Sequence, residues 1–401
     1  MNAFAVGGTI RATYTLAGAL AERGHDVEIV SVIRAREGPA LPPPPGVRLR
    51  ALTDLRPSSL ARRPLQRRLH DQPSRLISTN DRRYRSFSLL TDIALLRFLA
   101  SVRDGALIGT RPGLNLAIAH LASESVVRVG QDHMNLGGYS DALLARFLEA
   151  YPRLDLVSAL TERDAAGYRE LLGERPPVEV FPNAAPDVGG RRASLDDKLV
   201  IAAGRLTRQK AFGRLVDAWA DLAPRHPDWT LRIFGEGGKR RYLERQISRH
   251  GIADSARIEH FTDRLLDEFT HASIYAMTSR REGFPMVLLE AIGVGLPIVS
   301  VDCYTGPRDI VTDGVDGRIV PEGDRPALVA ALSEVMADDA KRKAFGAAAL
   351  GAAARYDRDR VAARWEARLQ ELSAAKPPGR RSIAGPVLRA LLLRVREAVR
   401  R

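Results

Sequence analysis

The second half of the chain alternates short apolar runs with longer stretches in which apolar residues recur every three or four positions. The runs are continuous, which is typical of strands buried on both faces of a parallel sheet. They predict strands at 199–203, 230–234, 257–260, 273–277, 297–301 and 317–320. The stretches between them predict helices at about 211–223, 238–250, 264–270, 285–294, 307–311, 324–337 and 340–354. We therefore expect an α/β domain with a parallel sheet covered by helices on both sides.

The first half follows the same alternation less regularly. It predicts strands at 27–32, 47–52, 106–109, 126–129, 155–160 and 178–181. It predicts helices at 9–23, 87–102, from the Arg111-Pro112-Gly113 loop to about 123, and at 161–172. The chain opens with a glycine turn, Gly7-Gly8, that leads straight into the first helix. A turn, a helix and a strand form the second half of a βαβ unit, and its first half is nearly missing.

The length of 401 residues is too great for one core and fits two domains. The pattern places them at residues 1–184 and 195–355, with a linker at about 185–197. Residues 376–401 differ in character, because their apolar residues fall on one helical face and arginines on the other. Such a basic amphipathic helix either lies on an anionic membrane or docks on its own protein.

The net charge of +13, from 61 basic and 48 acidic residues, favours an anionic partner. A nucleotide diphosphate, a phosphorylated acceptor, a lipid surface and a nucleic acid all fit that charge. The nine arginines between 56 and 85 form either a solvated loop or a basic surface for a phosphorylated or lipid-linked acceptor. Only 6% of residues are aromatic and no nucleic-acid-binding module is recognised, so we do not expect a nucleic acid partner.

The single cysteine, Cys303, excludes an internal disulfide and a cysteine-based zinc cluster. A reducing compartment, the cytoplasm, is the simple inference. No run approaches the roughly 18 apolar residues of a spanning helix, and the N-terminus lacks the pattern of a signal peptide. We therefore expect a cytoplasmic protein that is soluble or peripheral on the inner face of the membrane.

Two stretches carry candidate chemistry. Glu282 lies on a loop just before a helix that begins near Pro285, and Glu290 lies inside that helix, so both carboxylates can face one cleft beside the helix N–H groups. This arrangement suits an anion that carries hydroxyls. Arg205 and Lys210 lie five apart on a loop that opens another helix, where they can converge on two phosphates.

Two glycine turns are weaker candidates. The backbone at Gly7, Gly8 and Thr9 can approach a phosphate where a side chain would block it. Gly235 opens the turn Gly235-Glu236-Gly237-Gly238 after the strand at 230–234, and it either borders a nucleotide or forms an ordinary turn. Arg208 is a possible additional cation.

The Glu282-x7-Glu290 spacing, with Gly283-Phe284-Pro285 after the first glutamate and Gly295-Leu296-Pro297 closing the helix, resembles the donor-site motif of retaining glycosyltransferases of family 4. The resemblance covers most of residues 7–372. It implies that Glu282 faces the donor sugar and that Glu290 holds the ribose hydroxyls. It also implies that the intervening backbone meets the diphosphate, at Gly283, Phe284, Pro285, Met286 and Val287.

The same resemblance assigns Arg205 and Lys210 to the diphosphate, which they stabilise as leaving group. His133, just after the strand at 126–129, resembles a histidine that approaches the donor sugar. The sequence departs from the family pattern at Ala211, where glycine is usual, and at Pro285, where glycine is commoner.

The resemblance implies a GT-B fold, in which two Rossmann-like doubly wound domains face each other across a cleft. It places a buried strand before Asn2, so either the native start lies upstream, which we favour, or residues 1–6 form a stub of that strand. It also implies that a helix at 356–372 crosses back to the first domain. The resemblance further implies that anomeric configuration is retained by same-face attack, and we expect no protein nucleophile, cofactor or metal ion.

The stretch Asp302-Cys303-Tyr304-Thr305-Gly306-Pro307 resembles transferases of bacterial exopolysaccharides and wall polymers, with Tyr304 in place of a proline. This indicates a hexosyl or N-acetylhexosaminyl transferase that uses a nucleotide-diphosphate sugar, a UDP-sugar in particular, and a glycan, lipid-linked or wall-polymer acceptor. Two alternatives stay open: a nucleotide-sugar epimerase of the same architecture, and an inactive nucleotide-sugar-binding scaffold.

Overall fold

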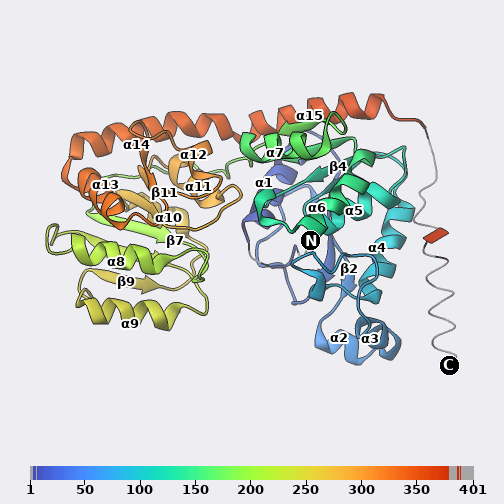
Figure 1. Ribbon diagram of the computed structural model, residues 1–401, viewed down its shortest axis with the longest axis horizontal. Helices are drawn as coiled ribbons and strands as arrows, with labels where there is room; N and C mark the ends of the chain where they lie inside the picture. The colour runs from blue at the N-terminus through green and yellow to red at the C-terminus, as the bar shows by residue number, and fades with distance from the viewer. Residues whose placement is uncertain (1–2, 6, 379–385, 388, 390–401) are drawn as a thin grey trace. The chain divides into compact units, whose positions relative to one another are not determined.

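The computed structural model describes residues 3–5, 7–378, 386–387 and 389 (Figure 1). The chain divides into two compact units. The first unit comprises Met1–Pro182 and Val361–Arg401, and the second comprises Asn183–Arg360. Each unit is an α/β layer structure with parallel strands, so the predicted fold class is confirmed.

The second unit is built on one six-stranded parallel sheet in the order β12-β11-β10-β7-β8-β9. Its strands are β7 (Leu199–Ala203), β8 (Thr230–Phe234), β9 (Ala256–Glu259), β10 (Ile274–Met277), β11 (Ile298–Asp302) and β12 (Gly317–Pro321). Its helices are α8 (Phe212–Leu222), α9 (Arg240–His250), α10 (Leu265–Thr270), α11 (Met286–Gly293), α12 (Pro307–Ile310), α13 (Arg325–Ala337) and α14 (Asp339–Ala353). Each predicted strand and helix of this half is present, because strands buried on both faces leave an unbroken apolar run.

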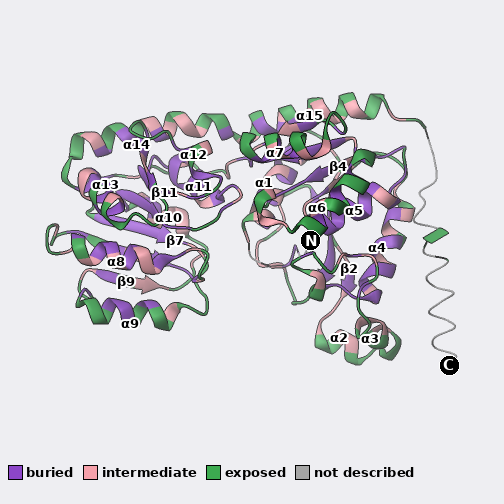
Figure 2. Ribbon diagram, viewed as in Figure 1, coloured by how far each residue is buried: buried purple, intermediate pink, exposed green. Residues whose placement is uncertain are grey.

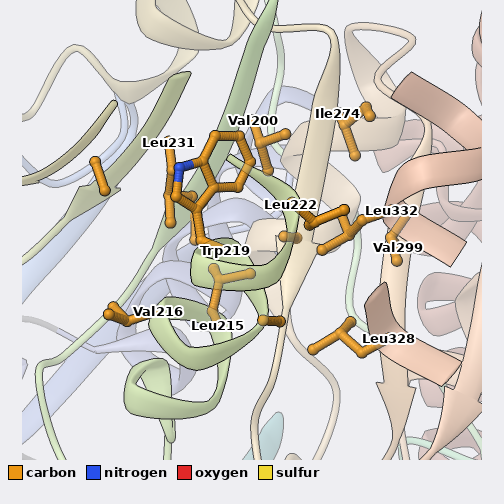
Figure 3. Close-up of a cluster of buried hydrophobic side chains, with 14 of the residues drawn as sticks. Val200, Leu215, Val216, Trp219, Leu222, Leu231, Ile274, Val299, Leu328 and Leu332 are labelled. Carbon is orange, nitrogen blue, oxygen red and sulfur yellow. The ribbon is translucent and has the colours of Figure 1, made fainter. Parts of the chain in front are cut away.

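The core of the second unit forms where α8 packs on the sheet. The buried face of α8 follows helical spacing through Leu215, Trp219 and Leu222. The Trp219 ring lies beside Val200 of β7 and Leu231 of β8 (Figure 3). Its indole nitrogen donates to Ser255 Oγ at 3.1 Å, which satisfies the polar edge of an otherwise apolar side chain.

The first unit carries two separate parallel sheets instead of one. One pairs β1 (Val27–Arg34) with β2 (Val47–Asp54), and the other has the order β3-β4-β5-β6. The strands of the second sheet are β3 (Ala106–Gly109), β4 (Val127–Gln131), β5 (Leu156–Ala159) and β6 (Val178–Val180). The longer helices of this unit are α1 (Gly8–Glu22), α4 (Leu89–Ser101), α5 (Pro112–Leu121), α6 (Asp141–Ala150) and α7 (Glu162–Leu172).

Three helices of the first unit were missing from the sequence prediction. Within the arginine-rich segment, α2 (Pro57–Ala61) and α3 (Pro64–His70) each begin at a proline, and neither carries a buried residue (Figure 2). Without a buried face they leave no periodic signal. The third, α6, buries Leu143, Phe147 and Ala150 at helical spacing, so its pattern was present in the sequence and was overlooked.

Helix α15 (Arg358–Ala374) belongs to the first unit from Val361 onward. Trp365 is fully buried with its ring 4.2 Å from that of Phe181, and Glu366 accepts from His25 at 2.8 Å. Asp357 caps the helix by accepting from the Arg360 amide at 2.9 Å.

Most of the predicted tail helix lies outside the described residues. Among the residues that the structure does describe, none of the helices combines the length and apolar character needed to cross a bilayer.

Candidate active site

The loops that follow β7 and β10 meet at the point where the strand order of the second unit reverses. The chain leaves β7 toward β8 on one side, while β10 pairs with β7 on the other. The Arg280 amide donates to the Gln209 carbonyl at 2.8 Å, and Gln209 Nε2 donates to the Arg281 carbonyl at 2.9 Å. In open α/β sheets, ligands bind outside the carboxyl ends of the strands at such a switch point.

Lys210 and Glu282 form an ion pair at this junction, with Nζ 2.6 Å from Oε1. Their side chains are only 16% and 10% exposed, so solvent screens the pair less than it screens a surface pair. The pair joins two predicted site residues that lie 72 positions apart in the sequence. It holds an ammonium group at a fixed place beside the start of α11.

Helix α11 itself is almost entirely apolar and buried, yet it contains Glu290 at 2% exposure. Pro285 is the N-cap residue and has extended backbone geometry, close to the predicted helix start. A buried carboxylate in an apolar helix costs free energy unless it is paired, so Glu290 marks this helix as more than a packing element.

The loop after β11 braces the segment that carries Glu282. Thr305 Oγ1 donates to the Glu282 carbonyl at 2.7 Å. Gly306 has a φ of +98°, and a Cβ there would lie 2.6 Å from Pro285 Cδ. The structural role of this stretch was not predicted from the sequence, although the Gly306-Pro307 pair signals a tight turn. Burial, and then the Glu282 charge, raises the pKa of the Cys303 thiol to about 12, so this thiol stays protonated and unreactive.

The glycines at 204, 235 and 237 let the loops after β7 and β8 pack backbone to backbone. A Cβ on Gly235 would lie 1.9 Å from the Gly204 carbonyl oxygen, and one on Gly237 would lie 2.5 Å from that of Leu206. The Leu206 amide donates to the Glu236 carbonyl at 2.8 Å. This packing explains why Gly235 is a glycine, and its contact with a nucleotide stays a prediction. We call this backbone packing of the loops after β7 and β8 the clamp. It also fixes the backbone of Arg205, whose side chain is exposed.

The loops after β7 and β10, which carry the Lys210–Glu282 ion pair, also carry four arginines. Arg205 and Arg208 follow β7, while Arg280 and Arg281 follow β10, and all four side chains are exposed. The second pair was not predicted from the sequence, because it is the hydrogen bonds of Gln209 that bring the loop of Arg280 and Arg281 beside the loop of Lys210. Four exposed arginines on the two loops that carry Lys210 and Glu282 favour an anionic ligand with more than one charge.

His133 lies in the first unit, directly after β4, and is buried without charge. Its Nε2 lies 3.1 Å from Gln131 Oε1, and burial lowers its pKa to about 4. The neighbouring Asp132 accepts from Tyr139 at 2.7 Å and from Tyr168 at 2.5 Å, while burial raises the pKa of Asp132 to about 6. The two tyrosines hold the His133 loop through Asp132, and no sequence pattern pointed to them because they come from different parts of the chain.

The predicted turn at Gly7, Gly8 and Thr9 forms the start of α1. Gly7 is the N-cap residue, with extended backbone at φ 168°, and a Cβ there would meet nothing within 4 Å. Neither backbone geometry nor packing therefore requires a glycine at this position. Close approach of a ligand to its backbone stays a prediction, as do the roles of the other site residues.

Comparison with known proteins identifies the family. The family model for glycosyl transferases group 1 matches residues 190–351. The amylovoran biosynthesis glycosyltransferase AmsD of Erwinia amylovora is 31% identical over 245 residues, which is 58% of this chain and 67% of that protein. The chain belongs to the group 1 glycosyltransferases.

Two further matches extend the comparison of this glycosyltransferase. An exopolysaccharide phosphotransferase of Streptomyces coelicolor is 34% identical over 390 residues, and the match covers 94% of this chain but only 40% of that protein. The structure of Anabaena HepE in complex with UDP-glucose matches with a TM-score of 0.66 at 17% identity, over 92% of this chain and 97% of that one. The structural match supports the GT-B fold expected from the sequence.

Among the described residues, no group of three or more His, Cys, Asp or Glu side chains is arranged to hold a metal ion.

Proposed function

We propose that this glycosyltransferase moves a hexosyl or N-acetylhexosaminyl group from a nucleotide-diphosphate sugar, a UDP-sugar in particular, to a glycan, lipid-linked or wall-polymer acceptor. The Lys210–Glu282 ion pair at the switch point carries the proposal. It places a fixed cation where α/β sheets bind nucleotides, next to a helix start that favours phosphate.

The proposed chemistry follows family 4 and retains anomeric configuration. The bond between the anomeric carbon and the diphosphate oxygen breaks, and the nucleotide diphosphate leaves with the electron pair. The acceptor hydroxyl oxygen bonds to the anomeric carbon from the same face, and its proton passes to the departing phosphate. Negative charge grows on the leaving group, so Lys210 and Arg205 act mainly on the transition state.

The remaining residues position the sugar donor in this proposal. Glu282 orients the sugar and Glu290 accepts from the ribose hydroxyls. His133 is neutral at physiological pH because its pKa is lowered, so it can line the sugar pocket as a hydrogen-bonding group without adding charge. The scheme needs neither a protein nucleophile nor a metal ion.

The names of related proteins support the choice of substrates. HepE was solved with UDP-glucose, and AmsD is named for the biosynthesis of amylovoran. The exposed arginines of the segment 56–85 fit a phosphorylated or lipid-linked acceptor. The basic tail at 376–401 fits peripheral binding to the anionic inner face of the membrane. Flotation with anionic liposomes, with and without residues 376–401, tests that part.

A double-label assay tests the transfer reaction. The full chain is incubated with UDP-glucose or UDP-N-acetylglucosamine, labelled with ¹⁴C in the sugar and ³²P in the β-phosphate, and with lipid-linked or polysaccharide acceptors. We expect a product that carries ¹⁴C without ³²P, with the anomeric configuration of the sugar donor by NMR.

The other outcomes are equally informative. A product with both labels would show sugar-phosphate transfer and overturn the proposal. A new nucleotide sugar formed without acceptor would establish the epimerase, and saturable binding of the nucleotide sugar without turnover would establish the scaffold.

A further inference from the structure

Arg111 is a partly buried arginine that the proposed transfer reaction does not use. It is the N-cap residue of α5, and its side chain is 25% exposed. Its Nε is buried and finds no hydrogen-bond partner among the described residues, while Asp81 Oδ1 lies 3.5 Å from its Nη2. A guanidinium group has five N–H donors, and burying them unpaired costs free energy. Arg111 therefore has donors available for an anionic ligand.

Arg111 lies at the carboxyl edge of the four-stranded sheet of the first unit. Gly109 of β3 pairs in parallel with Gly130 of β4, so the chain leaves these two strands side by side. Arg111 follows the end of one strand, and His133 follows the end of the other. This is the edge at which open α/β sheets bind ligands. An anion bound by Arg111 would therefore lie beside the loop of His133.

A turn of the arginine-rich segment contacts the same edge. Asp81 Oδ2 accepts from the Gly113 amide at 3.1 Å, and Arg82 Nη2 donates to the Gly138 carbonyl at 2.6 Å. The turn is thus attached both to the start of α5 and to the loop after β4. It carries the exposed side chains of Arg82 and Arg83 at this place.

The positive charge at this turn is incompletely compensated. Burial lowers the pKa of Arg111; Asp81 opposes this shift, and the charge of Arg83 adds to it. Arg83 is therefore near enough to repel Arg111. Asp81 already accepts from the amides of Gly113 and Arg83, and Asp132 accepts from tyrosine hydroxyls. An anion bound by both arginines would relieve the repulsion, and phosphate oxygens match the planar guanidinium group.

We propose that Arg82, Arg83 and Arg111 bind a phosphate group of the acceptor. The inference rests on the proposed function and narrows its acceptor to a phosphorylated one. It also separates this turn from the arginines of α2 and α3, two helices without a buried residue.

Calorimetric titration with phosphate probes tests the site apart from turnover. The full chain is first saturated with UDP, so that the donor site is occupied. It is then titrated with glucose 1-phosphate, which carries the phosphate on a sugar, or with farnesyl phosphate, which carries it on a lipid. Arg83→Ala and Arg111→Lys are compared with Arg97→Ala, which removes the same charge from an exposed position on α4.

We expect Arg83→Ala and Arg111→Lys each to weaken binding of at least one probe about tenfold, the lysine because it loses the planar fork. Arg97→Ala should change it less than about twofold. UDP affinity should stay constant in all three variants. Because Arg83 is exposed, its variant keeps the test valid even if Arg111→Lys lowers Tm.

The probes also identify the source of the phosphate. Selective loss of farnesyl phosphate binding would indicate a lipid-linked acceptor, and selective loss of glucose 1-phosphate binding would indicate a phosphorylated glycan. Failure of both probes to bind the UDP-saturated protein would overturn the proposal, as would equal losses in Arg83→Ala and Arg97→Ala.

The double-label assay separates failure of this site from failure of the proposed function. Sugar transfer by a protein that binds neither phosphate probe would overturn the site alone. Phosphate binding that depends on Arg83, without any sugar transfer, would support the phosphate site and overturn the proposed function.

Discussion

The loops at the carboxyl ends of the strands are built differently in the two units. In the second unit, backbone hydrogen bonds and glycine contacts clamp the loops after β7 and β8, and a partly buried ion pair joins the loops after β7 and β10. In the first unit, the turn at Gly7 has open space around it, and the loop at His133 is held by tyrosine hydroxyls on a carboxylate. One unit thus presents fixed positive charge, and the other presents a neutral histidine, a carboxylate bound by tyrosines and an open turn.

Disrupting the clamp between the loops after β7 and β8 should have the largest effect, a loss of folding stability. Gly235→Ser places a side chain 1.9 Å from the Gly204 carbonyl, so the two loops must separate, and we expect a loss of about 3 kcal/mol or more in unfolding free energy. The matched variant, Gly7→Ser, adds a side chain in open space at a helix N-cap and should change stability by less than about 0.5 kcal/mol.

Thermal unfolding of both serine variants measures the contrast. Equal losses would mean that the turn at Gly7 is packed as tightly as the clamp. If Gly7→Ser keeps its Tm but loses transferase activity, the predicted approach of a ligand to the Gly7 backbone gains support.

The buried pair Asp132 and His133 of the first unit should affect the pH dependence of stability. The folded protein keeps a proton on Asp132 up to about pH 6, whereas the unfolded chain releases it near pH 4, so this residue's contribution falls as pH rises through that window. His133 acts in the opposite sense. The unfolded chain binds a proton below about pH 6.5 that folded His133 takes up only near pH 4, so its contribution rises with pH.

In the native protein the two contributions offset each other. Asp132→Asn should leave a rise of about 3 kcal/mol between pH 4 and 6.5, and His133→Gln should leave a fall of similar size between pH 4 and 6. Pulse proteolysis in urea, with detection of β4 peptides, follows the first unit. Parallel pH profiles for both variants would show that the two groups do not titrate separately.

Whether the sequence could predict these features of the two units depends on how far apart along the chain the interacting residues lie. Apolar runs predict the strands of the second unit, and helix starts predict the loops after β7 and β10. Both are local signals in the sequence. The Lys210–Glu282 contact joins residues 72 positions apart and appears only once β10 is placed beside β7. Tyr139 and Tyr168 reach Asp132 from separate elements, and no spacing rule connects them.

The glycine turn at Gly7 has no apolar run before it, so the sequence predicted that the first half of this βαβ unit is nearly missing. Among the described residues, β1 pairs with no strand other than β2, and β3 with no strand other than β4.

The fixed charge of the second unit should matter mainly for turnover. Lys210→Ala removes the ammonium that the leaving diphosphate would face, and we expect kcat to fall about 10²-fold with a smaller change in donor binding. Lys198→Ala is the matched control, because Lys198 pairs with Asp228 on the surface just before β7. Steady-state kinetics and donor titration of both variants measure this. Equal losses in kcat and in donor affinity for Lys210→Ala would mean that it only holds the ground state.

Variants of Glu290 test whether the buried carboxylate of α11 contributes to binding of the sugar donor. Glu290→Ala should raise the KM for the sugar donor about tenfold while kcat changes little, because ribose contacts form equally in the ground state and the transition state. Glu290→Gln, which keeps the shape of the side chain, separates lost charge from lost packing. Unchanged KM in both variants would refute a ribose contact, and a Tm that falls only in the alanine variant would report packing.

The smallest effect concerns the residue that links the clamp to the ion pair. Ala211 has a φ of +51°, a left-handed conformation that costs an L-residue roughly 1–2 kcal/mol, and it lies between Lys210 and the start of α8. Ala211→Gly relieves that strain but loosens the unfolded chain, so we expect a gain of less than about 1 kcal/mol. Thermal unfolding detects the gain, and donor titration shows whether Lys210 keeps its place. A loss of stability would mean that the Ala211 methyl, which is buried, contributes more through packing than its backbone strain costs.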